Sequence, residues 1–262
     1  LVDSGHEALI DDPAYRSTFV YGNVLIEGDG EGNRQIVHYG GDSRDLTRYR
    51  QGTLYFYNNT VISTRSDRTT LFRLSSADES CEMWNNIVYT TQPGSHLELS
   101  NRDGTIRMRH NWVKAGWTPS FEAPVGTVED LGGTLTGDDP GFVDAAEQRF
   151  GLTAGSVCVA AGGDLAPGAG SHPVVKMYVK HREQAARPAD GRIDLGACER
   201  ASTDFDDSGA VDFSDFVLFA AAFGKTREHE MWEARFDLDG DGSVGFGDFL
   251  VFVRAFGAHA AV

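Results

Sequence analysis

The last quarter of the chain contains the same segment twice. DFDDSGAVDFSDFVLFAAAFG, from Asp204 to Gly224, returns 33 residues later as DLDGDGSVGFGDFLVFVRAFG, from Asp237 to Gly257. Residues 201–262 also hold 12 of the 39 acidic side chains but only 4 of the 23 basic ones. A repeat at a fixed period indicates two copies of one structural unit that bury their apolar faces together. We therefore predict two domains, at residues 1–200 and 201–262.

Each copy opens with a twelve-residue acidic loop of the EF-hand type. Such a loop offers a hard cation oxygen ligands from positions 1, 3, 5, 7, 9 and 12, with Gly at position 6 for the sharp turn. Position 6 is Gly209 in the first loop and Gly242 in the second. The predicted ligands are Asp204, Asp206, Ser208, the carbonyl of Ala210, Asp212 and Asp215 in the first loop, and Asp237, Asp239, Asp241, the carbonyl of Ser243, a water above Gly245 and Asp248 in the second.

The loops predict two bound ions, one per loop, and calcium as the metal. Magnesium is the lesser candidate because it demands a smaller octahedral cage. Each loop offers four carboxylates as ligands, so ion binding should be linked to folding. The alternative interpretation is that these segments are solvated acidic turns.

A helix should follow each loop, with Phe residues spaced along one face. The apolar stripes predicted to pack the two halves together are Phe216, Phe219, Phe223 and Phe249, Phe252, Phe256.

The first 200 residues show a different pattern, in which short β-branched and aromatic runs are interrupted by a polar pair. Each run predicts a strand, a bend and a second strand. Further apolar strands are expected between these runs, at residues 35–40, 71–76 and 96–101. The four runs are Thr18–Glu27, Thr53–Thr64, Cys81–Thr90 and Thr105–Lys114, and the second residues of their bends are Asn23, Asn59, Asn86 and Asn111.

The asparagines recur at spacings of 36, 27 and 25 residues, which is about one coil of a parallel β-helix. Asn suits a tight bend, and its amide can bond to the same residue in the next coil. We therefore predict a mainly β fold, a parallel β-helix, followed by a small all-α module. An antiparallel sandwich with Asn-rich turns is the alternative.

The units YNNTVIS and WNNIVYT, with DDPGFVDAAEQRFGLTAGSVCVAAG (Asp138 to Gly162) and IDLGACE (Ile193 to Glu199), carry a family resemblance. They resemble the closing coils of secreted bacterial right-handed parallel β-helix proteins of the pectate-lyase-like group, over residues 18–200. IDLGAC also suggests a last strand. The group includes lyases, hydrolases, epimerases and plain surface proteins, so the resemblance implies fold more than activity.

The C-terminal repeat resembles the type I dockerin module, whose two calcium loops end in Asp. In dockerins, loop positions 10 and 11 recognise a cohesin partner. Here these positions are Phe213, Ser214 and Phe246, Gly247 instead of the usual small polar pair. The resemblance implies calcium binding and a cohesin-like partner. A separate alternative is that the repeat is purely structural and docks on the end of the β-helix itself, where it shields the open last coil.

Candidate catalytic residues follow from the chemistry of β-helix polysaccharide lyases, in which a basic or His/Tyr group removes a proton beside a carboxylate. The candidates are His38, Tyr39, Arg107, Arg109 and Lys114. Carboxylate pairs for a glycoside hydrolase could come from Asp42, Asp45, Asp78 or Glu79. For each of these, a structural role is the simpler interpretation, as it is for the bend residue His110. Trp84, Trp112 and Trp117 could stack on sugars or fill the core.

Composition narrows the remaining possibilities. A net charge of −16 without a basic stripe argues against a nucleic-acid partner, and no apolar run is long enough to span a membrane. The three Cys residues favour buried free thiols, with a Cys158–Cys198 disulfide left open. The first residues, LVDSGHEAL, lack an initiator Met and a signal-peptide pattern, so we expect a fragment or a mature piece.

We therefore expect a secreted or cell-surface protein that processes or binds a polysaccharide. The alternative is a non-catalytic adhesion β-helix with a structural calcium module.

Overall fold

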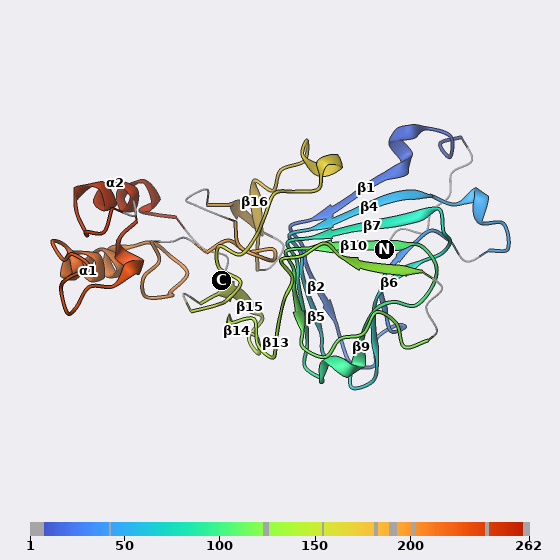
Figure 1. The fold of residues 1–262 in the computed structure, drawn as a ribbon, viewed down its shortest axis with the longest axis horizontal. Helices are drawn as coiled ribbons and strands as arrows, with labels where there is room; N and C mark the ends of the chain where they lie inside the picture. The colour runs from blue at the N-terminus through green and yellow to red at the C-terminus, as the bar shows by residue number, and fades with distance from the viewer. Residues whose placement is uncertain are drawn as a thin grey trace. The chain divides into compact units, whose positions relative to one another are not determined.

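In a computed structural model, the chain is mainly β, with two α-helices near the C-terminus (Figure 1). The structure describes residues 8–41, 43–122, 126–153, 155–180, 183–188, 193–200, 203–238 and 241–258. The predicted class, a mainly β fold followed by a helical segment, is therefore confirmed.

Parallel strands form three sheets. Strand order is β1-β4-β7-β10-β12 in the first sheet, β13-β11-β8-β5-β2 in the second and β3-β6-β9 in the third. Every neighbouring pair in these sheets is parallel, so the antiparallel sandwich is wrong. The strands are β1(Ser17–Tyr21), β2(Val24–Glu27), β3(Gln35–Tyr39), β4(Gly52–Tyr57), β5(Thr60–Ser63), β6(Thr69–Leu74), β7(Glu79–Trp84), β8(Ile87–Thr90), β9(Leu97–Ser100), β10(Thr105–Arg109), β11(Trp112–Lys114), β12(Thr127–Asp130) and β13(Leu135–Gly137).

Each predicted strand–bend–strand run supplies one strand to the first sheet and one to the second. The bends contain residues in the left-handed region, with φ of 48° at Asn58, 57° at Asn85 and 49° at His110. Asn tolerates this backbone region better than most residues. His110 occupies the same position in its bend, so its predicted structural role is confirmed.

The second Asn of each bend forms a ladder that runs across the sheets. The side-chain oxygen of Asn59 accepts the backbone N–H of Asn23 at 3.1 Å, and that of Asn86 accepts the N–H of Asn59 at 2.9 Å. Asn111 accepts the N–H of Asn86 in the same way, at 2.9 Å. The hydrogen bonds predicted for these residues are confirmed.

A continuous apolar core lies between the sheets. Alternate strand residues such as Leu54 and Phe56 on β4, and Cys81 and Met83 on β7, are fully buried. Trp112 is also fully buried, and Trp84 is 7% exposed and packs with Tyr57, so neither can serve as an open sugar platform. Trp117 is partly buried against the core.

Beyond the parallel sheets the chain forms two antiparallel hairpins, β14(Phe142–Asp144) with β15(Arg149–Leu152) and β16(Lys176–Val179) with β17(Glu183–Ala186). The segment 193–199 forms no strand, which corrects the expectation for IDLGAC. Its glycine, Gly196, instead donates its backbone N–H to the carbonyl of Asn85 at 2.8 Å. The short 3-10 turns are η1(Pro13–Arg16), η2(Leu46–Arg48), η3(Gly94–His96), η4(Pro167–Ala169) and η5(Ala234–Phe236).

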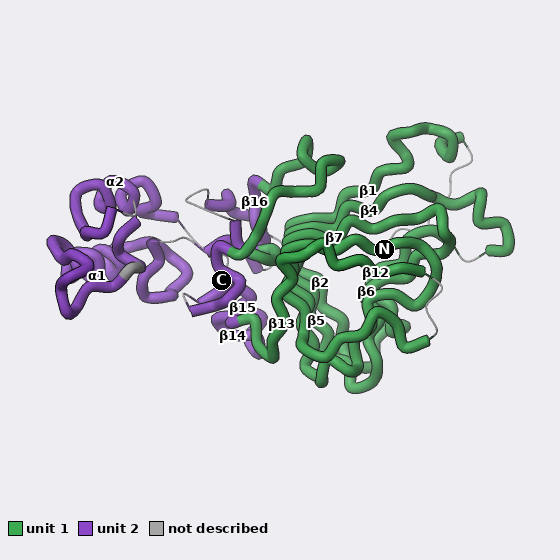
Figure 2. The backbone as a smooth tube through the Cα atoms, viewed as in Figure 1, with its two compact units in different colours: residues 1–140, 161–174, 195–197 green, residues 141–160, 175–194, 198–262 purple. Residues whose placement is uncertain are grey.

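The chain divides into two compact units (Figure 2). Unit 1 comprises residues 1–140, 161–174 and 195–197, and unit 2 comprises residues 141–160, 175–194 and 198–262. The boundary that the sequence suggests, at residue 200, stays a prediction.

Helices α1(Phe213–Ala222) and α2(Phe246–Ala255) begin at position 10 of the two acidic loops, so the last loop residues, Asp215 and Asp248, lie in the first helical turn. Phe219 and Phe252 are buried and stack, with ring centroids 5.5 Å apart. Phe216 and Phe249 are partly buried beside them. The predicted packing is therefore confirmed for these residues, but the last Phe of each stripe, Phe223 and Phe256, is half exposed.

Candidate metal site

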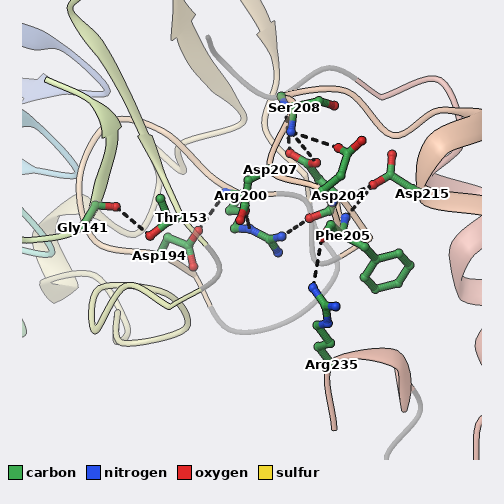
Figure 3. A network of polar contacts seen from close by, with 12 residues as sticks. Gly141, Thr153, Asp194, Arg200, Asp204, Phe205, Asp207, Ser208, Asp215 and Arg235 are labelled. Atoms are coloured by element: carbon green, nitrogen blue, oxygen red, sulfur yellow. Dashed lines mark hydrogen bonds and ion pairs between the residues drawn. The ribbon is translucent and has the colours of Figure 1, made fainter. Parts of the chain in front are cut away.

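Three carboxylates of the first acidic loop converge on one point. Asp204, Asp206 and Asp215 each offer an oxygen within 4.8 Å of the others. Asp204 and Asp215 are buried, whereas Asp206 is exposed. Figure 3 shows Asp215 joined to the backbone of Phe205, the residue that follows Asp204. Three carboxylate oxygens in this arrangement are suitable ligands for a hard cation such as calcium.

Backbone N–H groups hold these carboxylates in place. Asp215 accepts from the N–H of Phe205 at 2.6 Å and, with its other oxygen, from that of Asp212 at 2.8 Å. Asp204 accepts from the N–H groups of Ser208 and Gly209, at 3.1 and 3.0 Å. Gly209 has φ of 87°, which supplies the sharp turn expected at position 6.

The second loop repeats this hydrogen bonding 33 residues later. Asp248 accepts from the N–H of Leu238 at 2.5 Å and from that of Gly245 at 2.6 Å. Asp237 accepts from the N–H of Gly242 at 3.0 Å, and Gly242 has φ of 91°. The duplicated sequence therefore folds into duplicated loop geometry.

Among the described residues, one buried carboxylate oxygen of the second loop has no hydrogen-bond partner. The side chain of Asp237 is 4% exposed, and its Oδ1 atom is buried without a hydrogen bond. A buried carboxylate oxygen without a donor is costly, and a cation would satisfy it. Asp239 lies outside the described residues.

The other predicted ligands that the structure describes take part in local hydrogen bonds within their loops. Asp212 caps α1 by accepting the N–H of Ser214 at 2.7 Å. The hydroxyl of Ser208 lies 3.2 Å from the carbonyl of Ala210. In the second loop, Asp241 accepts from the N–H and the hydroxyl of Ser243, at 2.8 and 2.7 Å.

Burial and charge shape the electrostatics of the first loop. Burial raises the pKa of Asp204 to about 6, against the lowering effects of the Gly209 N–H and the Arg200 guanidinium. Asp215 and Asp207 raise it further because they carry like charge. A cation at this point would relieve the repulsion between the carboxylates.

Arg200 contacts the first acidic loop, and the sequence pattern did not reveal this contact. Its guanidinium donates to Asp207 Oδ1 at 3.1 Å and to the carbonyl of Asp204 (Figure 3). Arg200 and Asp204 also line a small pocket beside the loop, together with Arg149 and Leu152. Arg200 lies outside the repeat, so no periodicity marked it.

Each loop forms backbone hydrogen bonds with the residues that follow the helix of the other repeat. Val211 in the first loop exchanges backbone hydrogen bonds with Gly257 and Ala258, which follow α2. Val244 in the second loop exchanges them with Gly224 and Lys225, which follow α1. Each loop is therefore braced by the helix of the other repeat.

The structure separates the candidate catalytic residues. His38 and Tyr39 lie on the three-stranded sheet, Arg107 and Arg109 on the sheet of β1, and Lys114 on the sheet of β2. The catalytic assignment of these residues stays a prediction.

Most of these side chains have structural partners. Tyr39 is fully buried in the core. Arg107 lies between Glu82 and Glu129, with N–O distances of 3.3 Å to each. Lys114 is 9% exposed and donates to the carbonyl of Asp138 at 2.7 Å. Arg109 is exposed, and its guanidinium lies 5.6 Å from the ring centroid of Trp84.

His38 lies beside a serine hydroxyl, and strand β7 begins with a buried carboxylate, Glu79. The Nε2 atom of His38 lies 3.0 Å from the hydroxyl of Ser75. Glu79 is 1% exposed, and its Oε1 atom is buried without a hydrogen bond. Burial raises the pKa of Glu79, opposed by hydrogen bonds from Ser76. Of the other carboxylates considered for hydrolysis, Asp42 lies outside the described residues.

The three cysteines, Cys81, Cys158 and Cys198, are free and buried, as the interpretation as buried thiols predicts. None of the helices in the described part of the chain has the length and apolarity needed to cross a membrane. No family model, no curated protein and no solved structure matches this chain.

Proposed function

We propose that residues 201–262 form a dockerin-like module that binds two calcium ions and attaches a polysaccharide-directed domain outside the cell. The convergence of Asp204, Asp206 and Asp215 carries this proposal. The unpartnered oxygen of Asp237 supports a second ion in the second loop. Extracellular calcium is abundant enough to fill even weak sites of this type.

The exposed residues at the helix starts suggest how the module attaches. Phe213 and Phe246, at loop position 10 of each repeat, are 69% and 67% exposed. Large apolar side chains held in the open favour a protein partner over solvent. Such a partner would be cohesin-like in role, although Phe replaces the small polar residue usual at this position.

For the N-terminal part, the proposed architecture is a right-handed parallel β-helix of the pectate-lyase-like type. The three parallel sheets and the asparagine ladder support it. Stacked coils of this kind bury a common core that a single coil could not bury. The proposed ligand of this domain is a polysaccharide.

The metal proposal is tested by calorimetric titration of the chelator-treated full chain with calcium. Two bound ions are expected, together with a higher melting temperature in calcium than in chelator. Asp215→Asn should weaken the first site at least about tenfold, because it removes a ligand charge. Glu228→Gln is the matched control, since Glu228 is an exposed acid outside both loops. The absence of heat and of any thermal shift would refute the metal proposal.

A non-catalytic glycan-binding role is the second candidate. It is favoured by the partners of Arg107 and Lys114 and by the burial of Tyr39, which leave these groups engaged in structure. Incubation with uronate-containing and neutral polysaccharides separates the two roles. Release of unsaturated or reducing ends supports an enzyme, whereas retention without cleavage supports a binding protein.

A further inference from the structure

Three strands at the same end of the parallel stack have a partner on one side only. β1 is the first strand of its sheet and pairs with β4, β2 ends its sheet and pairs with β5, and β3 begins its sheet and pairs with β6. Within the described ranges, no strand lies on the other side of β1, β2 or β3. Open edges present unpaired backbone groups that favour the addition of another strand.

The asparagine ladder also ends at this edge with an open acceptor. The side-chain oxygens of Asn59, Asn86 and Asn111 each receive the backbone N–H of the asparagine one unit earlier. Asn23 donates its side-chain amide to the carbonyl of Tyr21 at 2.8 Å and to Asn59 at 3.1 Å. Among the described groups, none donates to the side-chain oxygen of Asn23. That oxygen occupies the position that would receive the N–H of an earlier asparagine.

The core is incompletely covered at the same end. Val20 on β1 and Leu25 on β2 pack against the core but are only partly buried. Their register partners one unit inward, Phe56 and Val61, are both 0% exposed. One more layer of strands would bury Val20 and Leu25 as these partners are buried.

The segment before β1 resembles the connection that leads into β4. The turn η1 precedes β1 with the sequence AYRSTFVYGN, and the turn η2 precedes β4 with RYRQGTLYFYNN. The two connections also touch, because the guanidinium of Arg50 lies 4.0 Å from the ring centroid of Tyr15 and donates to Thr18 at 2.8 Å. In the described structure, η2 carries the chain from the sheet of β3 into the sheet of β1. The equivalent position of η1 indicates a connection that arrives from a strand of the sheet of β3.

We propose that the edge formed by β1, β2 and β3 is a docking surface for one further strand–Asn–strand unit, carried ahead of β1 on the same polypeptide. Its asparagine would donate its N–H to the side-chain oxygen of Asn23, and its apolar strand residues would cover Val20 and Leu25. The inference rests on backbone pairing in the parallel sheets and is independent of calcium binding.

The test compares the present chain with an extended one. The extension places a copy of residues 52–74 ahead of residue 8, so that residues 8–16 serve as the connection. A matched control carries N59L within the added copy, which removes the asparagine but keeps the strands. Amide hydrogen exchange of β1 and β4 is measured in all three proteins, with the molar mass taken from light scattering.

In the present chain, the β1 amides that do not donate to β4 should exchange about a hundredfold faster than the β4 amides. The extension should slow them at least about tenfold, and the N59L copy should lose most of that protection. The proposal is overturned if the extension leaves β1 exchange unchanged, or if the β1 amides of the present chain are already as protected as those of β4. Protection in a dimer would assign the edge to a second copy of the chain and would equally overturn it.

Discussion

Replacing Asn86 by Ala tests whether the asparagine ladder is a main source of stability in the parallel stack. Asn86 is fully buried, and its side-chain oxygen accepts from the N–H and the side-chain amide of Asn59, at 2.9 and 3.1 Å. Its amide nitrogen donates to the carbonyls of Phe56 and Trp84, both at 2.9 Å, and to Asn111 at 3.0 Å. Ala would remove all of these bonds and leave their partners buried.

The expected cost follows from that inventory. The amide nitrogen has two hydrogens for three acceptors, so about four independent bonds are lost. At about 1 kcal/mol net for each bond, Asn86→Ala should lower the free energy of unfolding by about 3–5 kcal/mol. Asn23→Ala is the matched control at the open edge, where only two donated bonds are lost. It should cost no more than about 1 kcal/mol, because water can replace those bonds.

The measurement is urea unfolding followed by far-ultraviolet circular dichroism, on both variants and the unaltered chain in the same calcium concentration. The slope of the transition should stay constant if both variants unfold from the same native state. Equal stability losses for Asn86→Ala and Asn23→Ala would show that the buried ladder contributes no more than its exposed end, and the reasoning would fail.

Three further outcomes are expected. The calcium affinity of the first loop should be constant above pH 6 and fall by up to about tenfold per pH unit below it. The reason is that burial raises the pKa of Asp204 to about 6, so that below this pH the ion must displace a proton. Calorimetry at pH 5, 6 and 7 measures the affinity, and a pH-independent value would contradict the prediction. The same raised pKa means that the ion-free fold binds this proton more tightly than the unfolded chain, so the stability from this group is lost as the pH rises from about 4 to 6. Gly40→Ala should destabilise the fold by about 2–4 kcal/mol, because Gly40 has φ of 102° and a Cβ there would lie 2.7 Å from Glu79 Oε1. The control Gly30→Ala, at φ of 73° with open space around it, should cost only about 1 kcal/mol. Similar melting temperatures for the two variants would argue against a steric clash between the added Cβ and Glu79. Arg187→Met should lower the free energy of unfolding in urea by about 3–5 kcal/mol, because it leaves the buried Glu199 carboxylate, 2.7 Å away, without its cation. The double variant that also carries Glu199→Gln should recover part of this loss. An Arg187→Met variant as stable as the unaltered chain would show that the ion pair is dispensable.

Local patterns in the sequence predicted the elements whose partners recur at regular spacing. The bends at Asn59 and Asn86 were found because the same residue type returns in register, and the helices α1 and α2 because their Phe residues follow a helical period. The sequence did not reveal contacts between residues far apart without a repeat. The side-chain amide of Asn85 donates to the carbonyl of Gly163, 78 residues away, and no periodicity connects these positions.

The candidate site likewise contains residues that local spacing predicts and residues that it does not. Loop spacing identified Asp204 and Asp215, because twelve residues and one Gly suffice to define the turn. It missed Arg200 and the contact of Ser75 with His38, because Ser75 follows β6 on a short connection whose sequence has no distinctive motif. Burial, which leaves Glu79 Oε1 without a donor, depends on the assembled fold and is not written in the local sequence.

The bracing of Val211 by Gly257 and Ala258 has a consequence for synthesis. A ribosome produces the first loop well before those residues, so the first loop cannot take its final backbone pairing until the whole repeat has left the exit tunnel. The second loop, whose brace at Gly224 precedes it in the chain, can form as soon as it emerges. The order of completion is therefore the reverse of the order of translation, and a stalled or truncated chain that lacks Gly257 would carry an unbraced first loop however much calcium surrounds it.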